Sequence, residues 1–137
     1  MEKEFIQLLT SLHGLSGAVQ LAHWNVTGPE FPQYHDLFAR IYGMVSANID
    51  PVAEQARGSG VEIPAKIFHD VPELEWSTAV ELAEELYGVV EDYCNSLDKM
   101  HKVADKSDEY GILNIVEGMM TESRTIKYLL GSAIGKI

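Results

Sequence analysis

The chain has one cysteine, few basic side chains and no long hydrophobic run. A single cysteine, Cys94, excludes an intrachain disulfide and is typical of a reducing compartment. No apolar run approaches the roughly 20 residues that a membrane-spanning helix needs, and the first residues do not resemble a signal peptide. We therefore expect a cytoplasmic protein without a membrane segment.

Basic residues are scarce: 10 Lys and Arg stand against 21 Asp and Glu, which gives a net charge of −11. Proteins that bind nucleic acids use Lys and Arg to displace counterions from phosphate groups, and neither end of this sequence carries a basic tail. The charge balance therefore argues against DNA binding. It favours the attraction of metal cations.

The spacing of apolar residues predicts four helices and one long connection. Their gaps of three and four are typical of amphipathic helices, and 137 residues suit a single domain over 1–137. The predicted helices cover residues 3–26 and 31–57, then one begins at the capping box Thr78-Ala-Val-Glu81 and one at a cap formed by Ser107-Asp108. The connection from Gly58 to Trp76 has room for a short helix at 65–69. This order predicts an all-α, ferritin-like four-helix bundle with a long crossover between the second and third helices.

Four possible metal ligands lie in one stretch, residues 22–57. They are His23, His35, Asp50 and Glu54. In one straight helix His35 and Asp50 would be roughly 22 Å apart, whereas a metal holds its ligands at about 2.0–2.2 Å. The histidines could meet across the Gly28-Pro29 turn, and the carboxylates would then come from a second copy. A two-fold axis between antiparallel helices would build two identical sites of this kind.

The same helix is predicted to contact that second copy through a face of mostly small or apolar residues. Apart from the ligands, this face carries Ala39, Tyr42, Ser46, Ile49 and Ala53. Asp50-Pro51 leaves two interpretations open, because proline either kinks a helix or follows the cap of a new one. If Asp50 is such a cap, its carboxylate binds no metal.

Ferritin-type iron sites inside one bundle use two Glu-x-x-His pairs, and this sequence contains none. Its nearest substitute is Asp98-Lys-Met-His101, a pattern more typical of a solvated helix surface. We therefore do not expect an iron site within one bundle.

Three motifs resemble the Dps family, or miniferritins. They are His23-Trp24-Asn25-Val26-x-Gly28, His35-Asp-Leu-Phe38 twelve residues after the first histidine, and Asp50-Pro-Val-Ala-Glu54. The resemblance implies a hollow dodecamer that oxidises Fe(II), preferentially with hydrogen peroxide, and stores ferric iron. It implies ferroxidase sites at two-fold interfaces, with His23, His35, Asp50 and Glu54 as iron ligands. It also implies that Trp24 lies beside the iron and intercepts radicals. Alternatively, Trp24 is a packed core or interface residue.

One position departs from the family pattern. The family usually has an Asp four residues after the second histidine, where this sequence has Ala39. Asp36 points about 100° away from His35 on a helix and is a weak replacement. An alternative is therefore a ferritin-like cage that binds metal with weak or no turnover. DNA compaction, which some Dps proteins perform with basic tails, is a third function that the charge of this chain disfavours.

Overall fold

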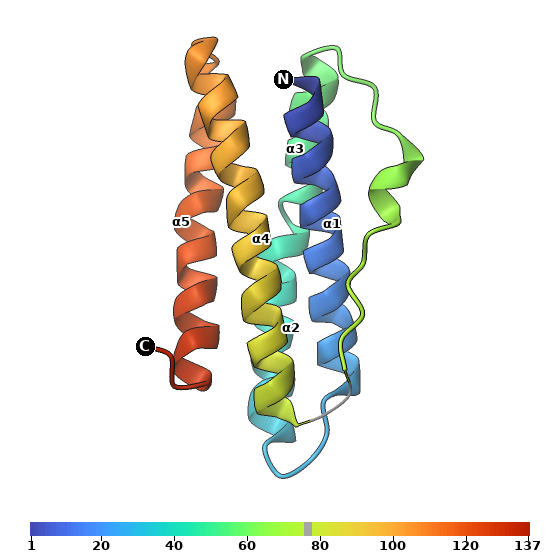
Figure 1. The fold of residues 1–137 in the computed structure, drawn as a ribbon, viewed down its shortest axis with the longest axis vertical. Coiled ribbons are helices and arrows are strands. Elements are labelled where there is room, and N and C mark those ends of the chain that lie inside the picture. Colours follow the sequence, from blue (N-terminus) through green and yellow to red (C-terminus); the bar gives the residue numbers. More distant parts are fainter. Residues whose placement is uncertain (76–77) are drawn as a thin grey trace.

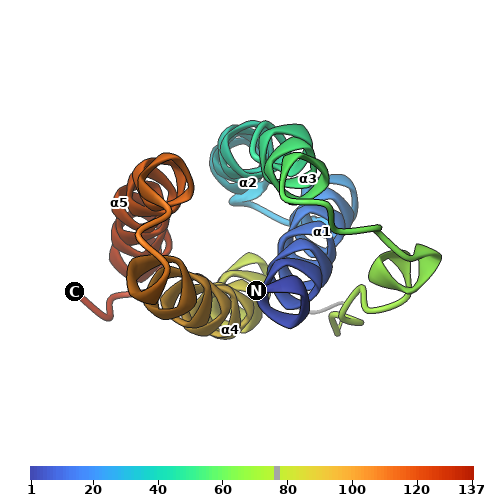
Figure 2. The same ribbon diagram turned by 90° about the horizontal axis from the view of Figure 1, so that it is seen from above.

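The computed structural model describes residues 1–75 and 78–137, so Trp76, the predicted end of the crossover, lies outside the described residues. Its helices are α1 (Glu2–Asn25), α2 (Phe31–Ser46), α3 (Ile49–Gly58), the 3-10 helix η1 (Ala65–Phe68), α4 (Ala79–Lys106) and α5 (Tyr110–Ala133). α2 and α3 lie end to end and form one column of the bundle beside α1, α4 and α5 (Figure 1, Figure 2). Within the described residues helix is the only regular secondary structure. The predicted four-helix architecture is confirmed.

The apolar stripes of the helices form a single core. Phe5 and Leu12 of α1, Phe38 of α2, and Leu86 and Leu97 of α4 are among its fully buried side chains. Burying one such side chain contributes about 1.5–3 kcal/mol, so these stripes decide which helix faces turn inward. In the described part of the chain, no helix is long and apolar enough to cross a membrane.

The helix ends agree with the predictions in one case and not in another. The Thr78 hydroxyl accepts a hydrogen bond from the Glu81 N–H (3.2 Å), as the capping box at the start of α4 predicts. The predicted Ser107-Asp108 cap of the last helix is wrong, because the N-cap residue of α5 is Glu109. Asp108 instead takes a φ of 54°. Asp tolerates this left-handed conformation, which turns the chain sharply from α4 into α5.

The predicted continuous helix 31–57 is wrong at Ala47 and Asn48, where the structure has a break between α2 and α3. Pro51 explains the break: it has no N–H to donate to the Ala47 carbonyl, and its ring crowds that carbonyl. The alternative that a new helical segment starts beside Pro51 is confirmed, but its predicted cap at Asp50 is wrong because the N-cap residue of α3 is Asn48. Among the described residues, the Asp50 carboxylate makes no hydrogen bond.

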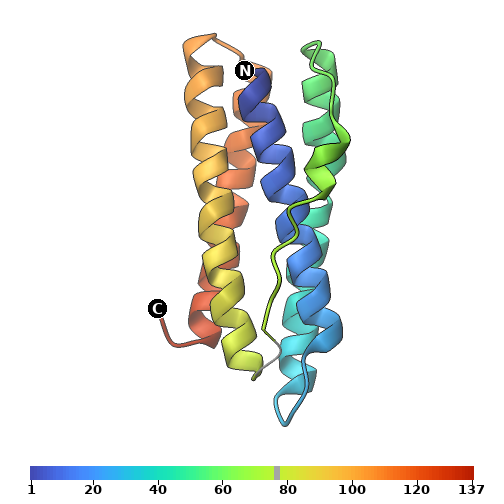
Figure 3. The same ribbon diagram turned by 45° about the vertical axis from the view of Figure 1, so that its right-hand side comes forward.

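The crossover returns along α1 from the end of α3 toward the start of α4 (Figure 3). It contains η1, the predicted short helix, whose Ile67 is buried and whose Phe68 packs edge-on against the His13 ring of α1 (4.7 Å between centroids). Gly14 makes this close approach possible, because a Cβ there would lie 2.5 Å from the Asp70 carbonyl oxygen. The crossover therefore covers one face of α1.

Tyr93 places a polar atom in the core. Its side chain is 1% exposed, and its hydroxyl has no hydrogen-bond partner among the described residues. An unpaired buried hydroxyl costs about 1–3 kcal/mol. We therefore expect Tyr93→Phe to raise the free energy of unfolding by about 1 kcal/mol, measured by urea denaturation at neutral pH and fixed protein concentration. A lower free energy would show that the hydroxyl has a partner.

The same substitution should change the response to alkaline pH. Burial, with a smaller contribution from the charge of Glu122, raises the pKa of Tyr93 well above its ordinary value. Above pH ~10 the unfolded chain loses this phenolic proton while the folded chain keeps it, so the free energy of unfolding falls by about 1.4 kcal/mol per pH unit. Tyr93→Phe should lack this part of the decline. Equal slopes for both proteins between pH 10 and 11 would contradict the assignment.

Candidate metal site

The turn between α1 and α2 brings His23 and His35 into contact. Gly28 takes a φ of +103° in this turn, which glycine adopts without strain. The His23 Nδ1 lies 2.9 Å from the His35 carbonyl oxygen, and the His35 Nδ1 lies 2.8 Å from the His23 carbonyl oxygen. Since a carbonyl only accepts, both Nδ1 atoms must donate. In the neutral imidazoles the protons are therefore on Nδ1, and both Nε2 lone pairs are free to bind a metal.

A stack of three rings fixes the orientation of the two imidazoles. The His23 and His35 rings are 4.0 Å apart between centroids, and their planes differ by 20°. Phe31 stacks on the other side of His35 at 4.7 Å. Hydrogen bonds and stacking together hold the pair as preformed nitrogen ligands, which limits the reorganisation needed to bind an ion.

The two carboxylates lie on a different helix from the histidines. Asp50 is in the first turn of α3, and Glu54 follows one turn later on the same face. Both side chains are exposed. In Figure 1 α3 occupies the opposite end of its column from the α1–α2 turn, and the two histidines lie in the helix ends on either side of that turn. The structure thus groups the predicted ligands into two separate pairs.

No group of three or more His, Cys, Asp or Glu side chains in the described residues is arranged to hold a metal ion. Each pair alone offers two ligands. A complete site within one chain would need the histidine and carboxylate pairs to meet, and their positions on the column prevent it. A metal site built from all four side chains therefore needs a second copy of the chain.

The sequence and the fold were compared with known proteins. A sequence model of the ferritin-like domain family matches residues 3–137.

The chain belongs to the ferritin-like domain family.

Relatives of this ferritin-like chain include the "DNA protection during starvation protein" of Brevibacillus brevis. It is 30% identical over 90 residues, which cover 64% of this chain and 60% of that protein, so the match spans less than two thirds of the relative. The "DNA protection during starvation protein 2" of Bacillus anthracis is 26% identical over 129 residues, 90% of this chain and 84% of the relative.

Solved structures of Dps proteins share the whole fold. Dps from Staphylococcus aureus has a TM-score of 0.88 at 19% identity, covering 97% of this chain and 93% of the solved chain. The recognition of a Dps-type miniferritin fold from three short motifs is thereby confirmed. At this identity the structural likeness concerns the fold alone.

The structure also places three further residues of the ferritin-like chain that the sequence analysis considered. Trp24 is 61% exposed and so is not packed in the core of its own chain. Ala39 lies on α2 one turn after His35 and is half-buried, whereas Asp36 is exposed. In the described residues, no carboxylate joins the two histidines to form a group of three side chains that could hold a metal ion.

Two side-chain contacts in the structure were not predicted from the sequence. Phe31 stacks on His35, and its spacing of four residues could have indicated this contact. His101, for which we expected a solvated surface, is only 29% exposed and makes a 2.9 Å contact with Glu117 of α5.

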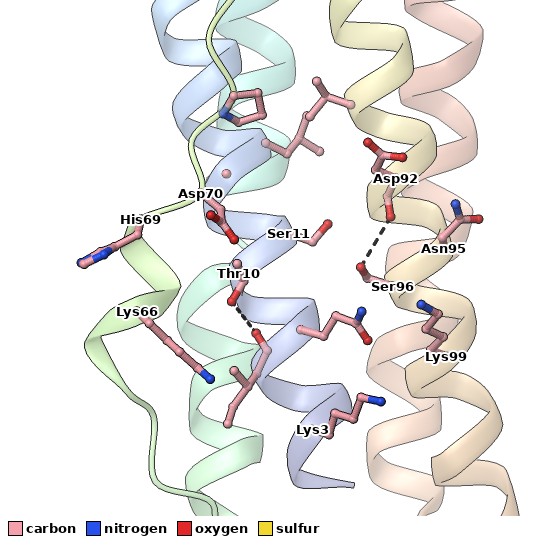
Figure 4. Close-up of a pocket in the computed structure, with 16 residues that line it drawn as sticks. Lys3, Thr10, Ser11, Lys66, His69, Asp70, Asp92, Asn95, Ser96 and Lys99 are labelled. Carbon is pink, nitrogen blue, oxygen red and sulfur yellow. Dashed lines mark hydrogen bonds between the residues drawn. The ribbon is translucent and has the colours of Figure 1, made fainter.

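A groove of about 790 Å³ between α1, the crossover and α4 contains none of the predicted ligands. Figure 4 shows lysines and aspartates around it. They are Lys3, Lys66, Lys99, Asp70 and Asp92. The groove therefore lies apart from the candidate metal site, and its charges are of both signs.

Proposed function

We propose that this chain is a Dps-like miniferritin that oxidises Fe(II), preferentially with hydrogen peroxide, and stores ferric iron inside a dodecameric cage. The observation that carries the proposal is the separation of a preformed histidine pair from a carboxylate pair on another helix. The histidines His23 and His35 present two free Nε2 atoms, and the carboxylates Asp50 and Glu54 are exposed on another helix. Only a second copy completes such a site.

A two-fold axis accounts for the arrangement. When two copies of the α2–α3 column run antiparallel, the histidine end of one lies beside the carboxylate end of the other, and the reverse holds by symmetry. Each dimer would then contain two equivalent sites. Trp24, exposed next to His23, would lie near this contact and is available there to donate an electron to a radical.

The ligand types suit iron chemistry. Neutral imidazole and carboxylate both bind Fe(II), and the carboxylates of Asp50 and Glu54 offset the extra positive charge as iron becomes ferric. Two Fe(II) ions each lose one electron, and one hydrogen peroxide takes up both electrons and two protons to give two waters. The peroxide is thereby consumed without release of a hydroxyl radical.

Ala39 favours a second candidate function, a cage that binds iron with weak or no turnover. Without a carboxylate one turn after His35, the position near this histidine has fewer ligands than the one near Asp50 and Glu54. A single well-held Fe(II) can supply one electron, whereas peroxide reduction to water needs two. DNA compaction remains disfavoured, since a net charge of −11 opposes binding to phosphates.

Assembly and oxidation are tested on one preparation. Twelve copies of a 15.2 kDa chain, 12 × 15.2, give a mass of about 182 kDa in sizing with light scattering. Anaerobic Fe(II) followed by half an equivalent of peroxide should give ferric absorbance that elutes with this species. A monomer or dimer would contradict the cage, and ferric precipitate equal to that of a protein-free sample would contradict the storage function.

His101→Gln is the matched control for this experiment. His101 and Glu117 form another imidazole–carboxylate pair on the surface, so nonspecific iron binding would involve them. We expect the variant to oxidise Fe(II) at the rate of the unmodified chain. If the unmodified chain binds Fe(II) tightly and in a fixed ratio but does not oxidise it, the second candidate function is supported.

A further inference from the structure

The joint between α2 and α3 has a built network of hydrogen bonds around Asn48. At the break, the Asn48 N–H bonds to the Val45 carbonyl (3.1 Å), one residue short of the usual helical partner, Met44. The Asn48 side chain replaces the lost bond, because its Nδ2 donates to the Met44 carbonyl oxygen (3.3 Å). The N-cap residue of α3 thereby supplies a hydrogen bond to a carbonyl group at the end of α2.

The other hydrogen of Asn48 Nδ2 reaches across the bundle. It donates to the Glu122 carboxylate of α5, with 2.6 Å between Nδ2 and Oε1. Both groups are half-buried, and a hydrogen bond to an ionised carboxylate is about twice as strong as a neutral one. α3 packs against α1 on one side. The Glu122 bond therefore ties the N-terminal end of α3 to α5 on another side.

This tie matters because the backbone ladder is interrupted at the joint. Pro51 cannot donate to the Ala47 carbonyl, so the angle between α2 and α3 is set by side chains as well as by the backbone. Asp50 follows Asn48 by two residues, and Glu54 lies one turn further along the same short helix. A change in that angle would move both carboxylates relative to the histidines of the other copy.

We propose that Asn48 and Glu122 are positioning residues, which set the direction in which α3 presents Asp50 and Glu54 to the metal. The inference rests on the proposed function, since it concerns the same carboxylate pair. Neither residue needs to touch the iron. Misplacing a reacting or binding group by about 1 Å can cost about 100-fold in rate, so even a small rotation of α3 would be measurable.

Asn48→Asp tests the tie while keeping a residue that favours the start of α3. Asp is a good N-cap and a favourable charge at a helix N-terminus, but its carboxylate cannot donate to Glu122 and repels it. We expect the KM for Fe(II) to rise about tenfold and the affinity for Fe(II), measured anaerobically by calorimetry, to fall about tenfold. The assembled mass should be unchanged.

The double variant Asn48→Asp/Glu122→Gln restores the tie in reverse, because the Gln amide donates to the new carboxylate. The Met44 carbonyl lacks its donor in both Asn48→Asp and the double variant, so comparing them isolates the bond between positions 48 and 122. We expect the double variant to recover KM to within about twofold of the unmodified chain. Glu122→Gln alone keeps an acceptor and should change KM little.

One control and one substitute variant separate a loss of positioning from general damage to the fold. Tyr93→Phe alters the core beside Glu122 but removes no hydrogen bond, so KM should not change. If Asn48→Asp fails to assemble, Glu122→Leu breaks the same tie and should raise KM equally. The inference is overturned if Asn48→Asp or its substitute Glu122→Leu keeps the KM of the unmodified chain, or if the double variant does not recover it. The proposed function would still stand. An unmodified chain that neither binds nor oxidises Fe(II) overturns both.

Discussion

Two inactive variants of this chain are expected to regain iron oxidation when they assemble together. The first lacks the imidazoles, His23→Gln/His35→Gln, and the second lacks the carboxylates, Asp50→Asn/Glu54→Gln. Each alone should lose about 100-fold or more of its peroxide-dependent oxidation rate, because even the outer partners of metal ligands are worth 10–100-fold. In a mixed dimer, however, one of the two sites contains the intact histidines of one chain and the intact carboxylates of the other.

The size of the recovery follows from the symmetry. Random pairing of equal amounts makes about half of the dimers mixed, and each mixed dimer has one complete site out of two. Co-refolded or co-expressed chains should therefore reach about a quarter of the unmodified oxidation rate. Separately assembled variants that are mixed without dissociation serve as the control and should stay inactive.

A site within one chain would give a different result. Every copy would then carry a defect, and co-assembly would restore nothing. Full activity in the carboxylate variant alone would place the oxidation elsewhere on the molecule. The experiment thus tests the two-fold site directly. Its result depends on the formation of mixed dimers and not on the number of copies in the cage.

The architecture could be predicted from the sequence because its signals are local and repeated. Apolar residues at helical spacing predict α4 and α5, and the Thr78 cap predicts where α4 begins. The same apolar residues show which face of each helix packs into the core. A new helix near Pro51 was one of two interpretations, but the position of the break at Ala47 and Asn48 escaped prediction for a physical reason. Pro51 acts on the carbonyl four residues upstream, so the helix ends before the proline and not at it. The cap at Glu109 escaped because the turn depends on the left-handed backbone of Asp108, which spacing does not reveal.

The candidate site was predicted in part. Helical rise alone separates His35 from Asp50, and this separation is visible in the structure as two ligand pairs. The tautomers of His23 and His35 could not be predicted, since they depend on carbonyl groups that only the folded turn brings within reach. The tie between Asn48 and Glu122 joins positions 74 residues apart in the chain, and no local pattern indicates it.

Ala39→Asp is expected to strengthen the weaker iron position. Ala39 follows His35 by one helical turn, so an Asp side chain there lies on the same face as the imidazole. Even the outer partners of metal ligands change metal affinity by about 10–100-fold, so an added carboxylate ligand should raise the Fe(II) affinity by at least about tenfold. Anaerobic calorimetry should detect two tightly bound Fe(II) ions per site, whereas the unmodified chain should bind one tightly and one weakly. The initial oxidation rate with peroxide should rise about tenfold.

Ala39→Asn separates charge from shape in this experiment. Asn has nearly the same size as Asp, but its amide oxygen is a weaker ligand and carries no charge to offset Fe(III). It should therefore leave the oxidation rate within about twofold of the unmodified chain. If Ala39→Asp changes neither the number of bound ions nor the rate, the second position does not lie beside His35. Two electrons for peroxide would then have to come from iron ions that reach the Asp50–Glu54 pair one after the other.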